Sequence, residues 1–73
     1  MARIKVNAEV TGSVWKIITQ QGQALAAGDT IMILESMKME IPVIAEDGGT
    51  LVELHVAEGE PVSEGQLVAT LDE

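Results

Sequence analysis

The stretch TIMILESMKMEIPVIA, residues 30–45, decides the fold of this chain. Two runs rich in isoleucine, leucine, methionine and valine, residues 30–35 and 39–45, flank a short segment that contains Lys38. Runs of this length and composition are typical of β-strands. Because so few residues separate the two runs, the chain must turn back on itself at Lys38. The sequence therefore predicts a β-hairpin with a lysine at its tip.

The chain repeats itself on either side of this tip. A shift of 37 residues superposes glycine on glycine and apolar residue on apolar residue: Gly12 on Gly49, Gly22 on Gly59, Gly28 on Gly65, Val14 on Leu51, Leu25 on Val62 and Leu34 on Leu71. Glycines between strand-like runs indicate turns, because glycine adopts positive φ without steric cost. We therefore interpret the chain as two copies of one small β unit that fold face to face around a shared core. Lys38 lies at the joint between the copies.

The remaining strand-like runs complete about eight strands. Besides the two runs of the hairpin, they cover residues 3–6, 13–19, 50–57 and 66–71, with short extended pieces at residues 24–25 and 61–62. Pro42 lies inside a run, which places that strand at a sheet edge or a bulge. Residues 46–49 form a turn signal. No ten-residue stretch has a helical period, so the sequence predicts one all-β domain over residues 1–73.

Composition and charge exclude several classes of function. The 73 residues carry a net charge of −8 and no cysteine. Nucleic acid is a poor partner for so acidic a chain, and a disulfide or a thiolate metal site is excluded. No apolar run approaches the ~20 residues of a membrane span, and no signal peptide opens the chain. We expect a cytoplasmic domain with no membrane partner, a location that the absence of cysteine fits.

Lys38 stands out from an ordinary surface lysine because of its neighbours. Lys5 and Lys16 are expected to be solvated surface residues. Met37 and Met39, by contrast, would expose two apolar side chains at a turn, which a purely structural hairpin does not need. Methionine adapts to many surfaces, so the pair could press against a docked ring or a partner protein. The alternative is that one of the two methionines points into the core.

The other residues capable of chemistry favour a carrier over an enzyme. His55 has no cysteine, tyrosine or second histidine beside it, and nothing in the sequence resembles a nucleophile–base–orienter series. We expect it to be an exposed or half-exposed strand residue, and we expect Trp15 to cover the core near a sheet edge. Glu35 and Glu40 flank Lys38 and are expected to act as recognition charges. The sequence thus predicts no catalytic and no metal site.

The segment Glu35-Ser36-Met37-Lys38-Met39 resembles the attachment segment of the biotinyl/lipoyl attachment domain family, in its biotinyl branch. The biotinyl branch has a Met-Lys-Met triplet preceded by a small residue, usually alanine and here Ser36. The resemblance covers nearly the whole chain, and the free-standing attachment proteins are the most similar in character. It implies a flattened barrel-sandwich of two four-stranded antiparallel sheets with internal pseudo-twofold symmetry and the modified lysine on a hairpin tip.

The resemblance also implies a function. Biotin protein ligase would join biotin to Lys38 using ATP, recognising the tip through Glu35, Ser36 and Glu40. The arm would then carry carboxylate between a biotin carboxylase site and a carboxyltransferase site. Two alternatives stay open: a lipoyl carrier that shuttles acyl or aminomethyl groups, and an unmodified β interaction module. Lipoyl domains usually show Asp-Lys-Ala at the tip, so Met37 and Met39 favour biotin.

Overall fold

Eight strands and no helix make up the part of the chain that the computed structural model describes, residues 3–73. The strands are β1 (Arg3–Asn7), β2 (Gly12–Ile17), β3 (Ala24–Leu25), β4 (Asp29–Ser36), β5 (Met39–Ala45), β6 (Gly49–Leu54), β7 (Pro61–Val62) and β8 (Leu67–Asp72). The all-β class and the number of strands that the sequence predicts are confirmed. The first two residues of the predicted domain lie outside the described residues.

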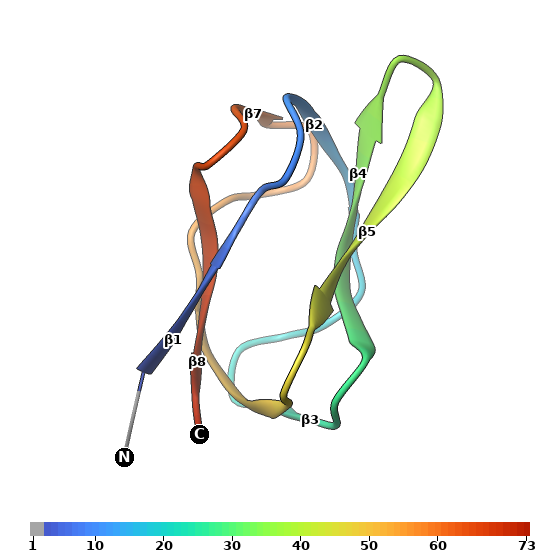
Figure 1. The fold of residues 1–73 in the computed structure, drawn as a ribbon. Helices are drawn as coiled ribbons and strands as arrows, with labels where there is room; N and C mark the ends of the chain where they lie inside the picture. Colours follow the sequence, from blue (N-terminus) through green and yellow to red (C-terminus); the bar gives the residue numbers. More distant parts are fainter. Residues whose placement is uncertain (1–2) are drawn as a thin grey trace.

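The strands form two four-stranded antiparallel sheets (Figure 1). One sheet has the order β1-β8-β6-β3 and the other the order β5-β4-β2-β7. A shift of 37 residues turns β1 into β5, β2 into β6, β3 into β7 and β4 into β8, so it converts the first strand order into the second. The predicted pseudo-twofold symmetry is therefore present in the topology itself.

The symmetry extends to individual backbone hydrogen bonds. The Gly28 amide donates to the Ala45 carbonyl, and its counterpart Gly65 donates to Ala8, both at 2.7 Å. The Gly22 and Gly59 amides form a second such pair: their acceptors, Leu51 and Val14, are themselves 37 residues apart. Each of these turns thus donates a hydrogen bond to the backbone of the other copy, within a strand or, at Ala8, just past one. The two units interlock, and neither could bury its apolar face alone.

Two equivalent glycines, one in each sheet, allow the backbones of two neighbouring strands to approach closely. A Cβ atom at Gly12 would lie 2.2 Å from the Glu35 carbonyl oxygen, and one at Gly49 would lie 2.6 Å from the Asp72 carbonyl oxygen. Real Cβ atoms do not approach a backbone oxygen this closely. Gly12 therefore permits β2 to start directly beside the end of β4, at the base of the hairpin tip.

The core lies between the sheets and is almost wholly aliphatic. Its most deeply buried members come in symmetric pairs: Val14 with Leu51, Leu34 with Leu71, and Ile31 with Val68. Burying an aliphatic side chain of this size contributes about 1.5–3 kcal/mol relative to leaving it exposed. With neither a disulfide nor a described metal cluster, this packing carries the stability of the fold.

Two strands end earlier than the sequence predicts. β2 stops at Ile17 where the prediction runs to residue 19, and β6 stops at Leu54 where the prediction runs to residue 57. Just past these ends the Ile18 amide still donates to the Ile31 carbonyl and the His55 amide to the Val68 carbonyl, each within its own sheet. The chain then crosses to the other sheet. Local β-propensity continues through both segments, but the tertiary contacts redirect them.

Trp15 does not cover the core, which corrects the prediction for this residue. It lies in β2, a central strand, and remains 49% exposed. The register between β2 and β4 shifts between Val14 and Lys16, so Trp15 is the extra residue of a β-bulge. The bulge turns the indole outward. Pro42 fits its prediction, since β5 is the edge strand of its sheet.

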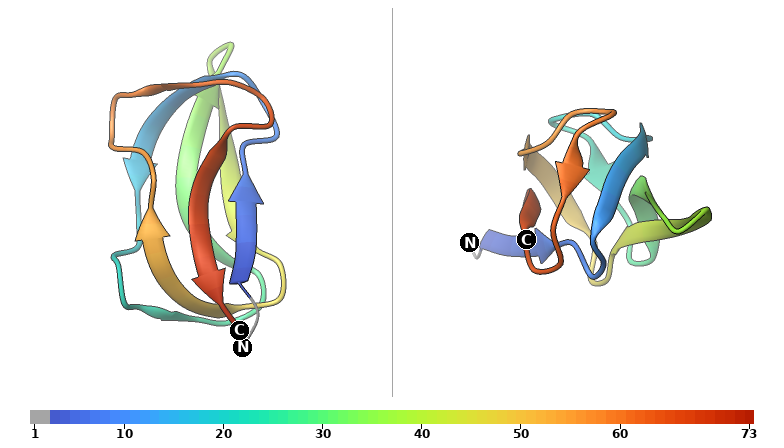
Figure 2. Two further views of the ribbon diagram at one scale, coloured as in Figure 1. Left: turned by 90° about the vertical axis from the view of Figure 1, so that its left-hand side faces the viewer. Right: turned by 90° about the horizontal axis from the view of Figure 1, so that it is seen from above.

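The molecule is elongated, with principal extents of 36 × 17 × 17 Å. The β4–β5 hairpin projects from one end, and both chain ends lie at the opposite end (Figure 2). The hairpin tip is therefore the part of the body farthest from the chain ends.

Candidate functional site

The β4–β5 hairpin is held in register from Asp29↔Ala45 up to Ser36↔Met39, and only Met37 and Lys38 form its turn. Their φ angles are 51° and 66°, which is the left-handed region. Two-residue hairpin turns of type I′ need positive φ at both central residues and usually contain asparagine and glycine. For most other residues the left-handed region costs roughly 1–2 kcal/mol of conformational free energy per residue. The tip therefore retains two larger side chains at a cost in stability.

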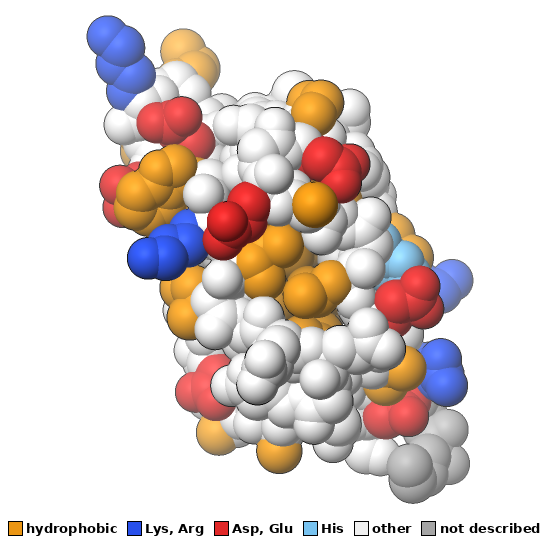
Figure 3. Space-filling view, turned by 180° about the vertical axis from the view of Figure 1, so that it is seen from behind, with side chains coloured by type: hydrophobic (Ala, Val, Ile, Leu, Met, Phe, Trp, Pro, Cys, Tyr) orange, Lys and Arg blue, Asp and Glu red, His pale blue; other side chains and the backbone are white. Residues whose placement is uncertain are grey.

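All three residues of the Met-Lys-Met triplet extend into solvent. Met37 is 92% exposed and Met39 is 63% exposed, so neither points into the core and that alternative is wrong. Lys38 is exposed as well, and no ion pair within residues 3–73 involves it. In Figure 3 a basic side chain projects beyond the rest of the body at the hairpin end. The arrangement presents a primary amine between two apolar, flexible side chains.

The base of the tip is fixed by contacts that the sequence did not reveal. The Ser36 hydroxyl donates to the Thr11 carbonyl at 2.8 Å, and the Thr11 hydroxyl accepts from the Glu64 amide at 3.0 Å. These bonds join the hairpin to two loops that are distant in sequence. Ser36 thus anchors the hairpin in addition to being small. The only hint of this contact in the sequence is a serine directly before the two-residue turn. The sequence does not indicate which residue accepts its hydrogen bond.

Glu35 and Glu40 lie directly opposite each other on neighbouring strands, and both are exposed. Like charges at opposite positions of a sheet destabilise it. Within residues 3–73, neither carboxylate takes part in an ion pair. The row of the sheet next to the tip is therefore acidic, and its two charges are free to meet a basic surface.

His55 shows an arrangement that the sequence analysis did not anticipate. Its Nε2 lies 2.8 Å from the Thr70 hydroxyl, and its Nδ1 lies 3.7 Å from a Glu53 carboxylate oxygen. This order of groups resembles a nucleophile–base–orienter series, contrary to the prediction. Thr70, however, is 9% exposed in the middle of a sheet. The bond gives a nearly buried hydroxyl a partner, so we assign His55 a structural role just past the end of β6.

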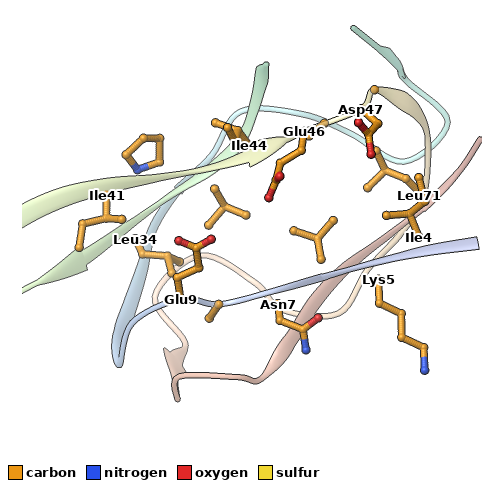
Figure 4. Close-up of a pocket in the computed structure, with 16 residues that line it drawn as sticks. Ile4, Lys5, Asn7, Glu9, Leu34, Ile41, Ile44, Glu46, Asp47 and Leu71 are labelled. Atoms are coloured by element: carbon orange, nitrogen blue, oxygen red, sulfur yellow. The ribbon is translucent and has the colours of Figure 1, made fainter. Parts of the chain in front are cut away.

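A groove of about 530 Å³ runs between β1 and β5, the edge strands that the two sheets turn toward each other (Figure 4). Its lining is symmetric, with Ile4 and Val6 on one side and Ile41 and Val43 on the other. None of residues 35–40 contributes to it. The candidate site is thus a projecting tip that lies outside this groove.

The described residues offer neither a metal-binding cluster nor a membrane-spanning helix. Among residues 3–73, no three histidine, cysteine or acidic side chains gather where they could hold a metal ion. The same residues contain no helix with the length and apolar character needed to cross a bilayer.

Comparison with known proteins identifies relatives that cover most of the chain. The family model described as "Biotin-requiring enzyme" matches residues 3–71. The chain is 46% identical over 67 residues to the "Biotinylated protein TB7.3 homolog" of Mycolicibacterium smegmatis, covering 92% of this chain and 94% of that protein. It is 38% identical over 66 residues to the "Biotin/lipoyl attachment protein" of Bacillus subtilis, covering 90% of each.

A solved structure shows the same fold inside a much larger enzyme. The chain superposes on part of the Kluyveromyces lactis urea carboxylase with a TM-score of 0.93 and 32% identity. The match covers 99% of this chain but only 6% of that enzyme. A domain like this one therefore exists both as most of a small protein and as a minor part of a large one.

Proposed function

The chain belongs to the biotinyl/lipoyl attachment family, and from that premise we propose that it is a biotin carrier in which Lys38 receives the cofactor. The observation that carries this proposal is the geometry of the tip. Lys38 is an exposed amine on a two-residue turn at one end of a rigid sheet, far from the chain ends. The residues fit a covalent group, because nothing in the described structure encloses or pairs the amine.

Attachment would form an amide between Nζ of Lys38 and the carboxyl carbon of biotin, after ATP has activated that carboxyl group as a mixed anhydride with phosphate. The C–O bond to the activating phosphate breaks, the nucleotide leaves, and the amine gives up a proton and with it the charge of the lysine. The ammonium form of a lysine has no free electron pair for this reaction. Within residues 3–73, no ion-pair partner holds the Lys38 amine. A base in the pocket of a ligase that also activates biotin with ATP would take the proton that the amine releases on attack, and the domain does not modify itself.

When attached, biotin supplies a ring that carries carboxylate between two sites. The chain's own contribution is to hold the arm on a body 36 Å long and to keep that body out of the reaction. A tethered group reaches a high effective concentration at each site without tight binding. The partners are then a biotin protein ligase and the biotin carboxylase and carboxyltransferase components, and the chain itself is not an enzyme.

The acidic row should govern how fast the ligase finds the tip. We expect Glu35→Lys to slow biotinylation about tenfold, because charge complementarity acts mainly on association rate. The free energy of unfolding should change by less than about 1 kcal/mol, since the substitution replaces a like-charged pair with an attractive one. Initial rates of biotinylation by purified ligase, followed by intact mass, would measure the effect.

The matched control for Glu35→Lys is Glu73→Lys, which changes the net charge equally at the far end of the chain. A control variant as slow as Glu35→Lys would mean that overall charge, and not the row beside the tip, sets the rate. A large loss of stability with normal biotinylation would make Glu35 a structural residue instead.

Met37 and Met39 should help to select biotin over lipoate. The double variant Met37→Asp with Met39→Ala should shift the ratio of the two cofactors toward lipoate by about tenfold, equivalent to about 1.4 kcal/mol of discrimination. Aspartate tolerates positive φ, so the turn should keep its shape. Both ligases would be offered to each protein, and the attached masses compared. Equal ratios for the two proteins would remove the methionines from the choice of cofactor.

A further inference from the structure

Because of the internal symmetry, each outward position of one sheet has an equivalent position on the other sheet. The residues at these equivalent positions differ in polarity. On the β5-β4-β2 side, six outward positions hold Trp15, Lys16, Ile18, Ile33, Pro42 and Ile44; the equivalent positions on the other sheet hold Val52, Glu53, His55, Thr70, Lys5 and Asn7. Five of the first six side chains are apolar, against one of the second six. We call the first set the Trp15 face.

The residues of the Trp15 face are neighbours on one surface. Trp15 and Lys16 together oppose Ile33 across the bulge, and Ile33 in turn opposes Pro42 on β5. Ile18 is placed by symmetry, because its equivalent His55 reaches the equivalent of Ile33, namely Thr70. In Figure 3, hydrophobic side chains lie above and below a basic one on the side of the view that carries the hairpin.

Folding does not require these apolar side chains. Trp15, Ile18 and Ile44 are 49%, 51% and 41% exposed, so much of their apolar surface meets water. The other sheet has the equivalent strand order and folds with the smaller Val52 and the polar His55 and Asn7 at these positions. Exposed apolar clusters of this kind mark interaction sites. The difference between two otherwise equivalent faces therefore points to a partner that only one of them meets.

The charges around the Trp15 face indicate which charges a complementary partner surface must carry. The next row toward the tip contains the opposed Glu35 and Glu40, while Lys16 is the cation within the face. Two copies of the chain would each bring a net charge of −8, so self-association is disfavoured. A partner with an apolar centre, basic residues opposite the two glutamates and a carboxylate opposite Lys16 would match the face.

We propose that the Trp15 face docks the ATP-dependent carboxylase component that loads the arm, an inference that rests on the proposed function. That enzyme binds two anions, ATP and bicarbonate, so the mouth of its site needs basic groups, and the acidic row fits them. β4 and β5 belong both to this face and to the hairpin. A partner seated on the face therefore fixes the direction in which Lys38 points.

The test exchanges residues between the two halves of the chain. The graft variant combines Trp15→Val, Ile18→His and Ile44→Asn, each copied from the equivalent position of the other sheet. The second variant is Trp15→Ala alone, and its matched control is Val52→Ala at the equivalent position. Each protein would be biotinylated, checked by intact mass and thermal melting, and used as the varied substrate of biotin carboxylase purified from the cells that make this chain.

We expect the graft variant to raise the KM for the carrier about tenfold or more with kcat within about twofold, and Trp15→Ala to raise it in the same direction. Val52→Ala should leave KM unchanged. An unchanged KM for both the graft variant and Trp15→Ala would overturn the proposal. It would also be overturned if sedimentation showed that the wild type is a dimer and the graft variant a monomer. If the graft variant does not fold, Trp15→Ala decides alone. Wild type that takes up no biotin would instead overturn the proposed function, and this inference with it.

Discussion

Replacing Lys38 with arginine is expected to abolish biotin attachment completely while leaving the fold unchanged. Arginine keeps the positive charge and much of the length of the side chain, but its guanidinium is always protonated and cannot act as the nucleophile. The side chain extends into solvent, so no packing contact is lost. The measurement is streptavidin binding and intact mass after incubation with ligase, ATP and biotin.

Lys5→Arg and Lys16→Arg are the matched controls, because they make the same chemical change at the other two lysines. Both should be biotinylated at the wild-type rate. Streptavidin binding that persists in Lys38→Arg and disappears in one of the controls would show that the attachment site lies elsewhere.

Gly12→Ala is expected to destabilise the protein by about 3 kcal/mol, a large part of the total stability of a domain of this size. The new methyl group would lie 2.2 Å from the Glu35 carbonyl oxygen, so β2 and the end of β4 would have to separate. The displacement falls at the base of the hairpin, next to the bond between Ser36 and Thr11. Urea denaturation followed by circular dichroism would give the free energy of unfolding.

Gly22→Ala is the control for Gly12→Ala, because it introduces backbone strain without a steric clash. Gly22 has φ +92° and nothing within 4 Å of an added Cβ, so alanine there meets backbone strain alone and should lose only about 1–2 kcal/mol. Gly49→Ala, the symmetric counterpart of Gly12→Ala, should be at least as damaging as Gly12→Ala. If Gly12→Ala were no less stable than Gly22→Ala, the close approach of the two strands would not be a constraint on this fold.

The symmetry of the fold could be predicted from the sequence because some backbone positions have no room for a Cβ atom and must be glycine. Gly12 and Gly49 are separated by the repeat length, and each faces the equivalent carbonyl, Glu35 or Asp72. A position that admits no Cβ atom stays glycine in both copies. The hairpin tip was predictable for a related reason, since residues 30–45 contain two strands and too few residues between them for anything but a turn.

Contacts between distant segments could not be predicted in the same way. The bond from Ser36 to Thr11, the partner of His55 and the outward turn of Trp15 all depend on where loops and bulges place side chains. Local propensity fixes none of these positions. The strand-like run that contains β2 continues through residue 19, for example, yet the strand ends at Ile17 because the chain then crosses to the other sheet.

The most direct test of a biotin carrier modified at Lys38 is the intact mass of the protein purified from the cells that make it, followed by mapping of the modified peptide. We expect the mass of the chain plus one biotinyl group, with the addition on the peptide that contains Lys38. A mass increase that matches lipoate, or a chain with no addition from cells that contain active biotin ligase, would contradict the account.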